Sequence, residues 1–307
     1  MVRHGPTPAV VMATGFTPLV IAAGVIVARL NLRLRIQKRK LLVSDIIMVL
    51  TLLVGLTSIW FLIRFNTLGA LDPNVTTTME SFRGDPENIP KIFKTFWLAN
   101  IPLCTTLYLS KAALLSMYLQ IFPEFMRKRR IFLWAVITYV AMAYVTTILL
   151  IFCICIPFET NWDMDPQSTC PTSRTKLAFE INWSLHFFGD LVIFALPWLI
   201  VPTLNVRRSL KIGIYFTFLL GLIDILFTLL RFITIEKADI RDSTPLGLVF
   251  MWSALDSHIG IIVACLPSLR PYFGNKDQGY GAKSNSDVKS MPSHAGIAAH
   301  QKREQEA

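Results

Sequence analysis

The sequence predicts an all-α membrane protein, a bundle of seven transmembrane helices with its N-terminus outside and its C-terminus in the cytoplasm. Three observations lead to this prediction. Hydrophobic residues make up 53% of the 307 residues and charged residues only 16%, whereas soluble domains carry about a quarter charged residues. The hydrophobic residues lie in long blocks. Lys and Arg are divided unevenly among the short segments between those blocks.

Seven blocks are long enough to cross a membrane. About 20 apolar residues span a hydrocarbon core about 30 Å thick, and backbone groups in lipid must be hydrogen-bonded within their own segment, so each block is predicted to be a helix. The first block is too long for the apolar core of a signal peptide and lacks an obvious cleavage site. The predicted spans cover residues 8–29, 41–63, 95–122, 131–156, 177–202, 211–235 and 246–269.

The chain divides into a membrane domain, 1–273, and a tail, 274–307. The tail is rich in Gly, Ser, Asn, Lys and Gln and has no apolar periodicity, which predicts a disordered segment. The formal net charge of +10 lies in short basic runs between the apolar blocks. Such runs fit membrane topology and anionic lipid rather than nucleic acid.

Orientation follows from the charges of the loops, because Lys and Arg favour the cytoplasmic side. The first and fifth loops contain basic residues and no acid, and the third contains four basic residues against Glu124. The even loops carry several acids each. The odd loops are therefore predicted to be cytoplasmic. The sequon Asn74-Val75-Thr76 then lies outside and can be glycosylated, and Cys170 lies where a disulfide can form.

Polar residues within the spans are the candidates for function, because ionisable groups in lipid are costly. Counting 1.5 Å per residue along each helix places several of them near the bilayer midplane or within a turn or two of it. Helical spacing puts His186 and Asp190 on one face of the fifth span, and Asp224, Thr228 and Arg231 on one polar stripe of the sixth. The predicted ligand-binding residues are Lys111, His186, Asp190, Asp224, Trp252, Asp256 and His258.

Two interpretations of this polar layer stay open: a cavity that binds a ligand, ion or protons, and hydrogen bonds that only hold helices together. Three carboxylates and one ammonium in one cavity would leave a negative charge. We therefore expect one carboxylate to be protonated, or a cation or His258 to supply the missing charge. Glu180 and Arg231 lie nearer the outer face as possible partners. Lys111 can pair with Asp45 or Asp190, extend toward the cytoplasm, or form a Schiff base.

Several segments resemble the fungal rhodopsin-like domain, the seven-helix family of Pth-type GPCR-like receptors and membrane proteins of toxin gene clusters. They are the run Ser110 to Tyr118, Cys155-Ile156-Pro157 followed by Trp162 and Cys170, Asp190 to Pro197, the series Arg208, Lys211, Gly221 and Arg231, and Trp252 to Pro271. The second span reads Ser44-Asp45 where the family often has two aspartates.

The resemblance implies a seven-helix fold and a disulfide between Cys155 and Cys170, with Cys104 as the rival partner. It implies no light sensing, and no lysine occurs between Lys237 and Lys276, so the last span cannot form a Schiff base with retinal and we expect no cofactor.

The function predicted is a GPCR-like receptor or sensor for an unknown small molecule, in the plasma membrane rather than an internal one. The basic inner loops would contact a cytoplasmic signalling partner or anionic lipid. The alternatives are a transporter or proton-coupled carrier, and a membrane scaffold of a biosynthetic cluster. No spacing of nucleophiles, acids or metal ligands indicates an enzyme.

Overall fold

The computed structural model describes residues 5–36, 38, 41–79, 81–121, 127–163, 170–200, 208–239 and 244–266. All of them belong to one compact unit, Met1–Pro271. The predicted tail, 274–307, lies outside the described residues. Four acidic residues of the predicted loops, at positions 80, 124, 165 and 242, also lie outside the described residues.

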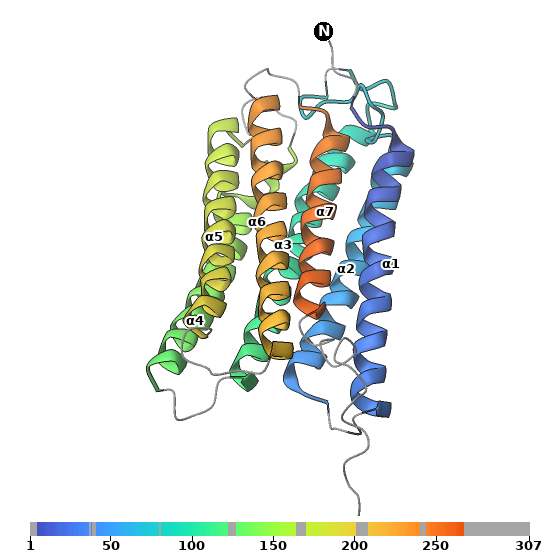
Figure 1. Ribbon diagram of the computed structural model, residues 1–307. Helices are drawn as coiled ribbons and strands as arrows, with labels where there is room; N and C mark the ends of the chain where they lie inside the picture. Colours follow the sequence, from blue (N-terminus) through green and yellow to red (C-terminus); the bar gives the residue numbers. More distant parts are fainter. Residues whose placement is uncertain are drawn as a thin grey trace, which may run out of the picture. The chain divides into compact units, whose positions relative to one another are not determined.

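Seven long helices make up the described part of this unit, and each is apolar enough to cross a membrane. Figure 1 shows them side by side with α3 behind α6 and α7, and α3 packs against α2, α4, α5 and α7. The helices are α1 (Pro8–Asn31), α2 (Val43–Thr67), α3 (Asn88–Ile121), α4 (Arg127–Cys153), α5 (Thr172–Ile200), α6 (Arg208–Asp239) and α7 (Leu246–Cys265). The predicted class, an all-helical protein with seven spans, is confirmed.

The helix ends differ from the predicted spans where a helix leaves the apolar region. Helix α3 begins seven residues before the predicted span, and α6 ends four residues after it. Hydropathy locates only the apolar part of a helix. The extra turns are held by packing, since Ile92 of α3 is fully buried in an apolar cluster with Phe65 of α2.

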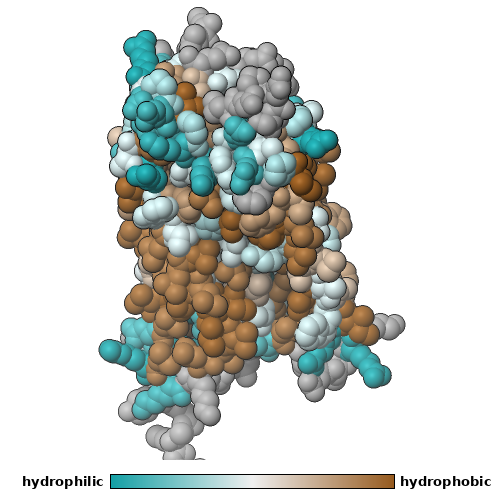
Figure 2. Space-filling model, turned by 180° about the vertical axis from the view of Figure 1, so that it is seen from behind, coloured by the Kyte–Doolittle hydropathy of each residue, from teal (hydrophilic) through white to brown (hydrophobic). Residues whose placement is uncertain are grey.

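Large apolar side chains cover the outside of the bundle between its two ends. Figure 2 shows this hydrophobic band with hydrophilic residues gathered above and below it. Val20, Trp60 and Met142 on three different helices each expose 60% or more of their surface. A soluble protein rarely exposes an apolar surface of this extent, so the chain is a multi-pass integral membrane protein.

The N-terminal segment closes one end of the bundle, which we call the N-terminal end. Gly5 donates a backbone hydrogen bond to Pro73 at 2.8 Å, and Leu246 at the start of α7 donates one to Val75 at 2.9 Å. A Cβ atom on Gly5 would lie 2.7 Å from the Cβ of Pro245, so only glycine fits there. The first residues, the loop after α2 and the start of α7 therefore form one cap.

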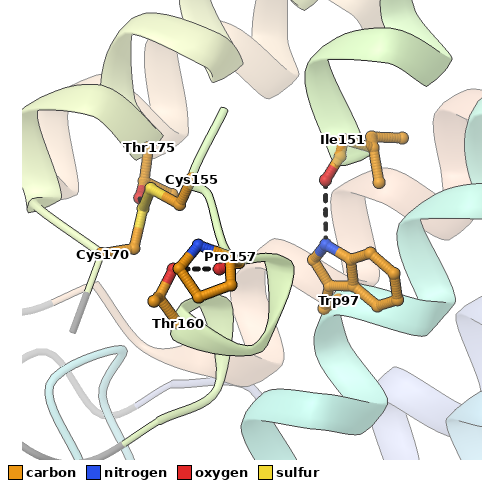
Figure 3. Close-up of a disulfide and its surroundings, with 7 residues drawn as sticks. All are labelled: Trp97, Ile151, Cys155, Pro157, Thr160, Cys170 and Thr175. Atoms are coloured by element: carbon orange, nitrogen blue, oxygen red, sulfur yellow. Dashed lines mark hydrogen bonds between the residues drawn. A yellow bond between two sulfur atoms is a disulfide. The ribbon is translucent and has the colours of Figure 1, made fainter. Parts of the chain in front are cut away.

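The predicted disulfide joins Cys155 and Cys170 in the loop between α4 and α5 (Figure 3). Cys104, the rival partner, is a buried free cysteine. Beside the bridge, the indole nitrogen of Trp97 donates a hydrogen bond to the carbonyl oxygen of Ile151 at 3.0 Å (Figure 3). The disulfide thus joins the two ends of the loop, one next to α4 and the other next to α5. The hydrogen bond of Trp97 holds α3 to α4 beside it.

Replacing Cys155 with serine is expected to destabilise the protein by about 2–4 kcal/mol, because the bridge closes a short loop and restricts the unfolded chain. Thermal unfolding of purified protein measures the loss. Cys153→Ser is the matched control, since Cys153 is an exposed free cysteine two residues away. Equal unfolding temperatures for both variants, or two free thiols at positions 155 and 170 by mass spectrometry, would contradict the prediction.

Candidate functional site

Lys111 of α3 forms an ion pair with Asp190 of α5 in the middle of the bundle. Each side chain is only 5% exposed, and the ammonium also donates a hydrogen bond to the carbonyl oxygen of His186 at 3.2 Å. Of the partners predicted for this lysine, Asp190 is the one used, while Asp45 pairs with Arg29. The pair joins α3 to α5, since neither charge is stable alone in a low-dielectric interior.

His186 links two carboxylates. It lies one turn before Asp190 on α5, and its Nδ1 atom is 3.1 Å from Oδ2 of that residue. On its other side, Nε2 is 3.6 Å from Oδ2 of Asp256 on α7. The four-residue spacing puts His186 and Asp190 on one face of α5, as predicted, and the imidazole extends the contact to α7.

Asp256 is 1% exposed and is held from α6. Its Oδ2 atom accepts a hydrogen bond from Nη1 of Arg231 at 2.9 Å, and its Oδ1 atom accepts one from the hydroxyl of Thr228 at 3.1 Å. Thr228 and Arg231 are three residues apart, so they share one face of the helix. The suggested pair of Arg231 with Glu180 is therefore wrong, because α6 presents this face to α7.

Arg231 and Thr228 are site residues that the sequence prediction left out. Both belonged to the predicted polar stripe of this helix, and Arg231 and Asp224 are its only charged residues between 212 and 235. An arginine so deep in an apolar block was a usable signal, because its charge is permanent. We call the connected residues Lys111, Asp190, His186, Asp256 and Arg231 the charge chain.

The charges of this region can balance without His258, which the sequence analysis had offered as a source of positive charge. The charge chain contains two basic residues and two carboxylates, and the third carboxylate, Asp224, lies beside it. The total is zero when one proton is held by either His186 or Asp224. Arg231 and this single proton would therefore be enough to supply the missing positive charge.

Asp224 lines a cavity of about 40 Å³ together with Lys111 and Asp190, which we call the Lys111 cavity. Among the described residues no hydrogen bond or ion pair reaches its carboxylate. An ideal Cβ on Gly260 of α7 would lie 3.7 Å from Oδ1 of Asp224 and 3.4 Å from the hydroxyl of Ser110. The absence of a side chain on Gly260 thus keeps this cavity open between α3 and α7.

His258 lines a different cavity, of about 110 Å³, which we call the His258 cavity. It shares no lining residue with the Lys111 cavity. The sequence placed His258 in the same layer as Asp256, and the two are close in depth. However, two residues along a helix point about 200° apart, so Asp256 faces α5 and α6 while His258 faces the other cavity.

Several polar atoms of the His258 cavity lack partners. In the described part of the chain, buried atoms without a hydrogen bond include Oγ of Ser58, Nε of Arg231 and both ring nitrogens of His258. All three residues line this cavity. Buried polar groups in native proteins are nearly always satisfied, so these atoms indicate a site that a ligand or water completes.

Trp252 lines neither cavity. Trp252 lies one turn before Asp256 on α7, and the centroid of its ring is 6.3 Å from that of Phe227 on α6. Across the described ranges, no three His, Cys, Asp or Glu side chains come together as metal ligands. The predicted set therefore divides among the charge chain with Asp224, the His258 cavity, and Trp252 in the contact between α6 and α7.

Comparisons with known proteins give one family and one distant relative. The model of the fungal rhodopsin domain matches residues 28–275. A polyenoic acids biosynthesis gene cluster protein from Metarhizium anisopliae is 25% identical over 198 residues, which cover 61% of this chain. The match spans about half of that relative, 53% of its length. No solved structure matches this chain.

Proposed function

This chain belongs to the fungal rhodopsin domain family, and on that premise we propose that it is a receptor-like membrane protein whose ligand binds in the His258 cavity. The observation that carries the proposal is the set of unpaired buried polar atoms on Ser58, Arg231 and His258. Small-molecule sites are mainly apolar with a few polar groups that orient the ligand. The lining of this cavity has that composition.

Arg231 gives such a ligand a way to change the helix packing. It lines the cavity and at the same time holds Asp256 at 2.9 Å. A ligand that attracts the guanidinium competes with Asp256, and the change passes to His186 and Asp190 along the charge chain. Binding then favours one of two packings of α5, α6 and α7, as a receptor requires.

Filling the His258 cavity is expected to abolish ligand binding. Ala254 of α7 lines it, and Ala254→Leu places three more carbon atoms inside. Purified parent protein should be stabilised against heat by some members of a set of amphipathic small molecules, because binding to the folded state raises its stability. The variant should lose these shifts. Ala135→Leu, on the exposed face of α4, is the control, and equal shifts in both variants would contradict the site.

A carrier is the second candidate, and one observation favours it. The two cavities are separate, and the charge chain connects Arg231 in one with Lys111 and Asp190 in the other. A transporter uses such a layer as a barrier between two half-channels and as a relay for protons. Ligand or proton flux across reconstituted vesicles would favour the carrier, whereas stabilisation without flux favours the receptor.

Glycosylation tests the proposed orientation, with the N-terminal end outside. Asn74 is exposed in the cap, and the protein expressed in a eukaryotic cell is expected to lose mass on treatment with a peptide N-glycosidase. Thr76→Ala destroys the sequon without touching Asn74 and should abolish that loss. Ser184→Ala is the control, because it destroys a second sequon, Asn182-Trp183-Ser184. Asn182 lies within α5 and accepts a hydrogen bond from Thr147, so this variant should keep the loss of mass. A C-terminal tag open to protease on intact cells would contradict this orientation.

In the proposed orientation, the basic loops after α1, α3 and α5 would face the cytoplasm and contact an acidic partner or anionic lipid. We further propose the plasma membrane, rather than an internal membrane, as the site of action. The name of the Metarhizium relative supports a third candidate, a membrane component of a biosynthetic gene cluster. We propose no enzymatic activity.

A further inference from the structure

The His258 cavity is polar at one end and apolar at the other. On α7 its lining changes from Phe250 to Ser257 and His258 with increasing distance from the N-terminal end, and on α2 it changes from Phe65 to Ser58. Helix α3 contributes Phe96 nearer the N-terminal end, then Asn100 one turn deeper and Leu103 beyond it. A ligand that satisfies this lining has its apolar part toward the N-terminal end and its polar group near the midplane.

This polarity is opposite to that of a lipid. A membrane lipid that enters a bundle from the bilayer keeps its head group at the interface, where water solvates it. Here the unpaired donors lie about two helical turns below the aromatic residues, and the side chain of Arg231 is only 12% exposed. The occupant is therefore a small molecule that is enclosed with its polar group.

The charge of the lining selects an anion. Arg231 carries a permanent positive charge, and no Asp or Glu lines the cavity. Asp256 binds the guanidinium through Nη1, while Nε has no partner. An arginine edge with two N–H donors matches a carboxylate. A carboxylate can accept hydrogen bonds from the guanidinium and share it with Asp256, whereas a cation would be repelled by it.

The volume limits the apolar part of the ligand. An apolar cavity of about 150 Å³ holds benzene, and the His258 cavity has about 110 Å³. From charge, polarity and volume together, and resting on the proposed function, we infer that this cavity binds a small monocarboxylic acid whose carboxylate contacts Arg231. Short aliphatic acids have this chemistry.

Head-group exchange on one carbon skeleton tests the inference. Purified protein in neutral detergent is heated with hexanoate, hexanamide, hexanol or hexylamine at one pH and ionic strength. Hexanoate is expected to raise the unfolding temperature in proportion to the logarithm of its concentration, and the other three are expected to give smaller shifts. Butanoate and octanoate then separate a water-borne small acid from a longer acid that partitions from the membrane.

Two variants test the contact with Arg231. Arg231→Lys keeps the charge but removes the planar pair of donors, and it should weaken hexanoate binding about tenfold or more. Arg64→Lys, at an exposed position near the end of α2, is the matched control and should bind hexanoate as the parent does. If Arg231→Lys does not fold, His258→Leu tests the polar end of the same cavity in its place and should also weaken hexanoate binding. His258 lines the cavity and has no hydrogen bond to lose.

The outcomes separate the ligand class from the site. Equal shifts by all four head groups that vanish in Ala254→Leu would overturn the carboxylate and leave the ligand site standing. If no acid of the series gives a shift while other amphipathic molecules bind at the cavity, the carboxylate is likewise overturned and the ligand site stands. Acid-induced shifts that persist in Ala254→Leu would overturn both the inference and the proposed function.

Discussion

Replacing Lys111 with methionine is expected to destabilise the protein by about 3–5 kcal/mol, the range for removing one partner of a buried ion pair. The substitution leaves Asp190 buried at 6% exposure, with His186 as its remaining neighbour among the charged groups of the charge chain. It also removes the hydrogen bond to the carbonyl oxygen of His186. The measurement is the unfolding temperature of purified protein, together with the yield of monodisperse material.

Lys176→Met is the matched control, because Lys176 forms an ion pair with Glu236 whose side chains are 39% and 28% exposed. Exposed pairs contribute about 1 kcal/mol or less. The double variant Lys111→Met with Asp190→Leu should recover much of the lost stability, since no charge is then left unpaired. Equal losses for the two lysine variants would show that Lys111 is not buried in an ion pair.

Neutralising the aspartates one at a time is expected to divide them into two kinds. Asp256→Asn should destabilise by about 3–5 kcal/mol, because it leaves Arg231 buried without a counter-charge. Asp190→Asn should act similarly through Lys111. Asp224→Asn should change stability by no more than about 1 kcal/mol, because in the described part of the structure no ion pair or hydrogen bond is lost.

The same three variants test how protons are shared. With Asp224 present, the charges sum to zero when one proton is bound by either Asp224 or His186. In Asp224→Asn, the charges of the charge chain sum to zero when His186 is neutral. Stability of Asp224→Asn should therefore vary less than that of the parent between about pH 5 and 8, where histidine changes charge. If all three variants keep the pH profile of the parent, the aspartates act separately and the shared charge layer is wrong.

Much of the fold followed from hydropathy and loop charge, because lipid imposes simple rules on length and backbone hydrogen bonding. Depth along each helix was equally accessible, since 1.5 Å per residue is constant. Lys111 and Asp190 were therefore recognised as possible partners, and His186 was placed on the same face as Asp190. The disulfide between Cys155 and Cys170 followed from family resemblance rather than from the residues alone.

The rotation of each helix and its neighbours did not follow from the sequence. Arg231 and Glu180 were plausible partners by depth, but the packing of α6 against α7 decides that Arg231 contacts Asp256. His258 has the same depth as the charge chain and yet faces another cavity. Without neighbour relationships, one polar layer could not be resolved into a charge chain and two separate cavities.

The cap at the N-terminal end sets an order for the assembly of the membrane unit. The position of Gly5 is enclosed by Pro73 and Pro245, and α1 packs along α7, so the segment before α1 has neighbours next to α7, which follows the other six described helices in the chain. Until α7 is inserted, α1 has an unfilled side and Gly5 has the loop after α2, at Pro73, but not Pro245 as a neighbour. Docking of this segment can therefore be completed only after α7 is in the membrane, and a chain truncated before α7 leaves the segment open to quality control.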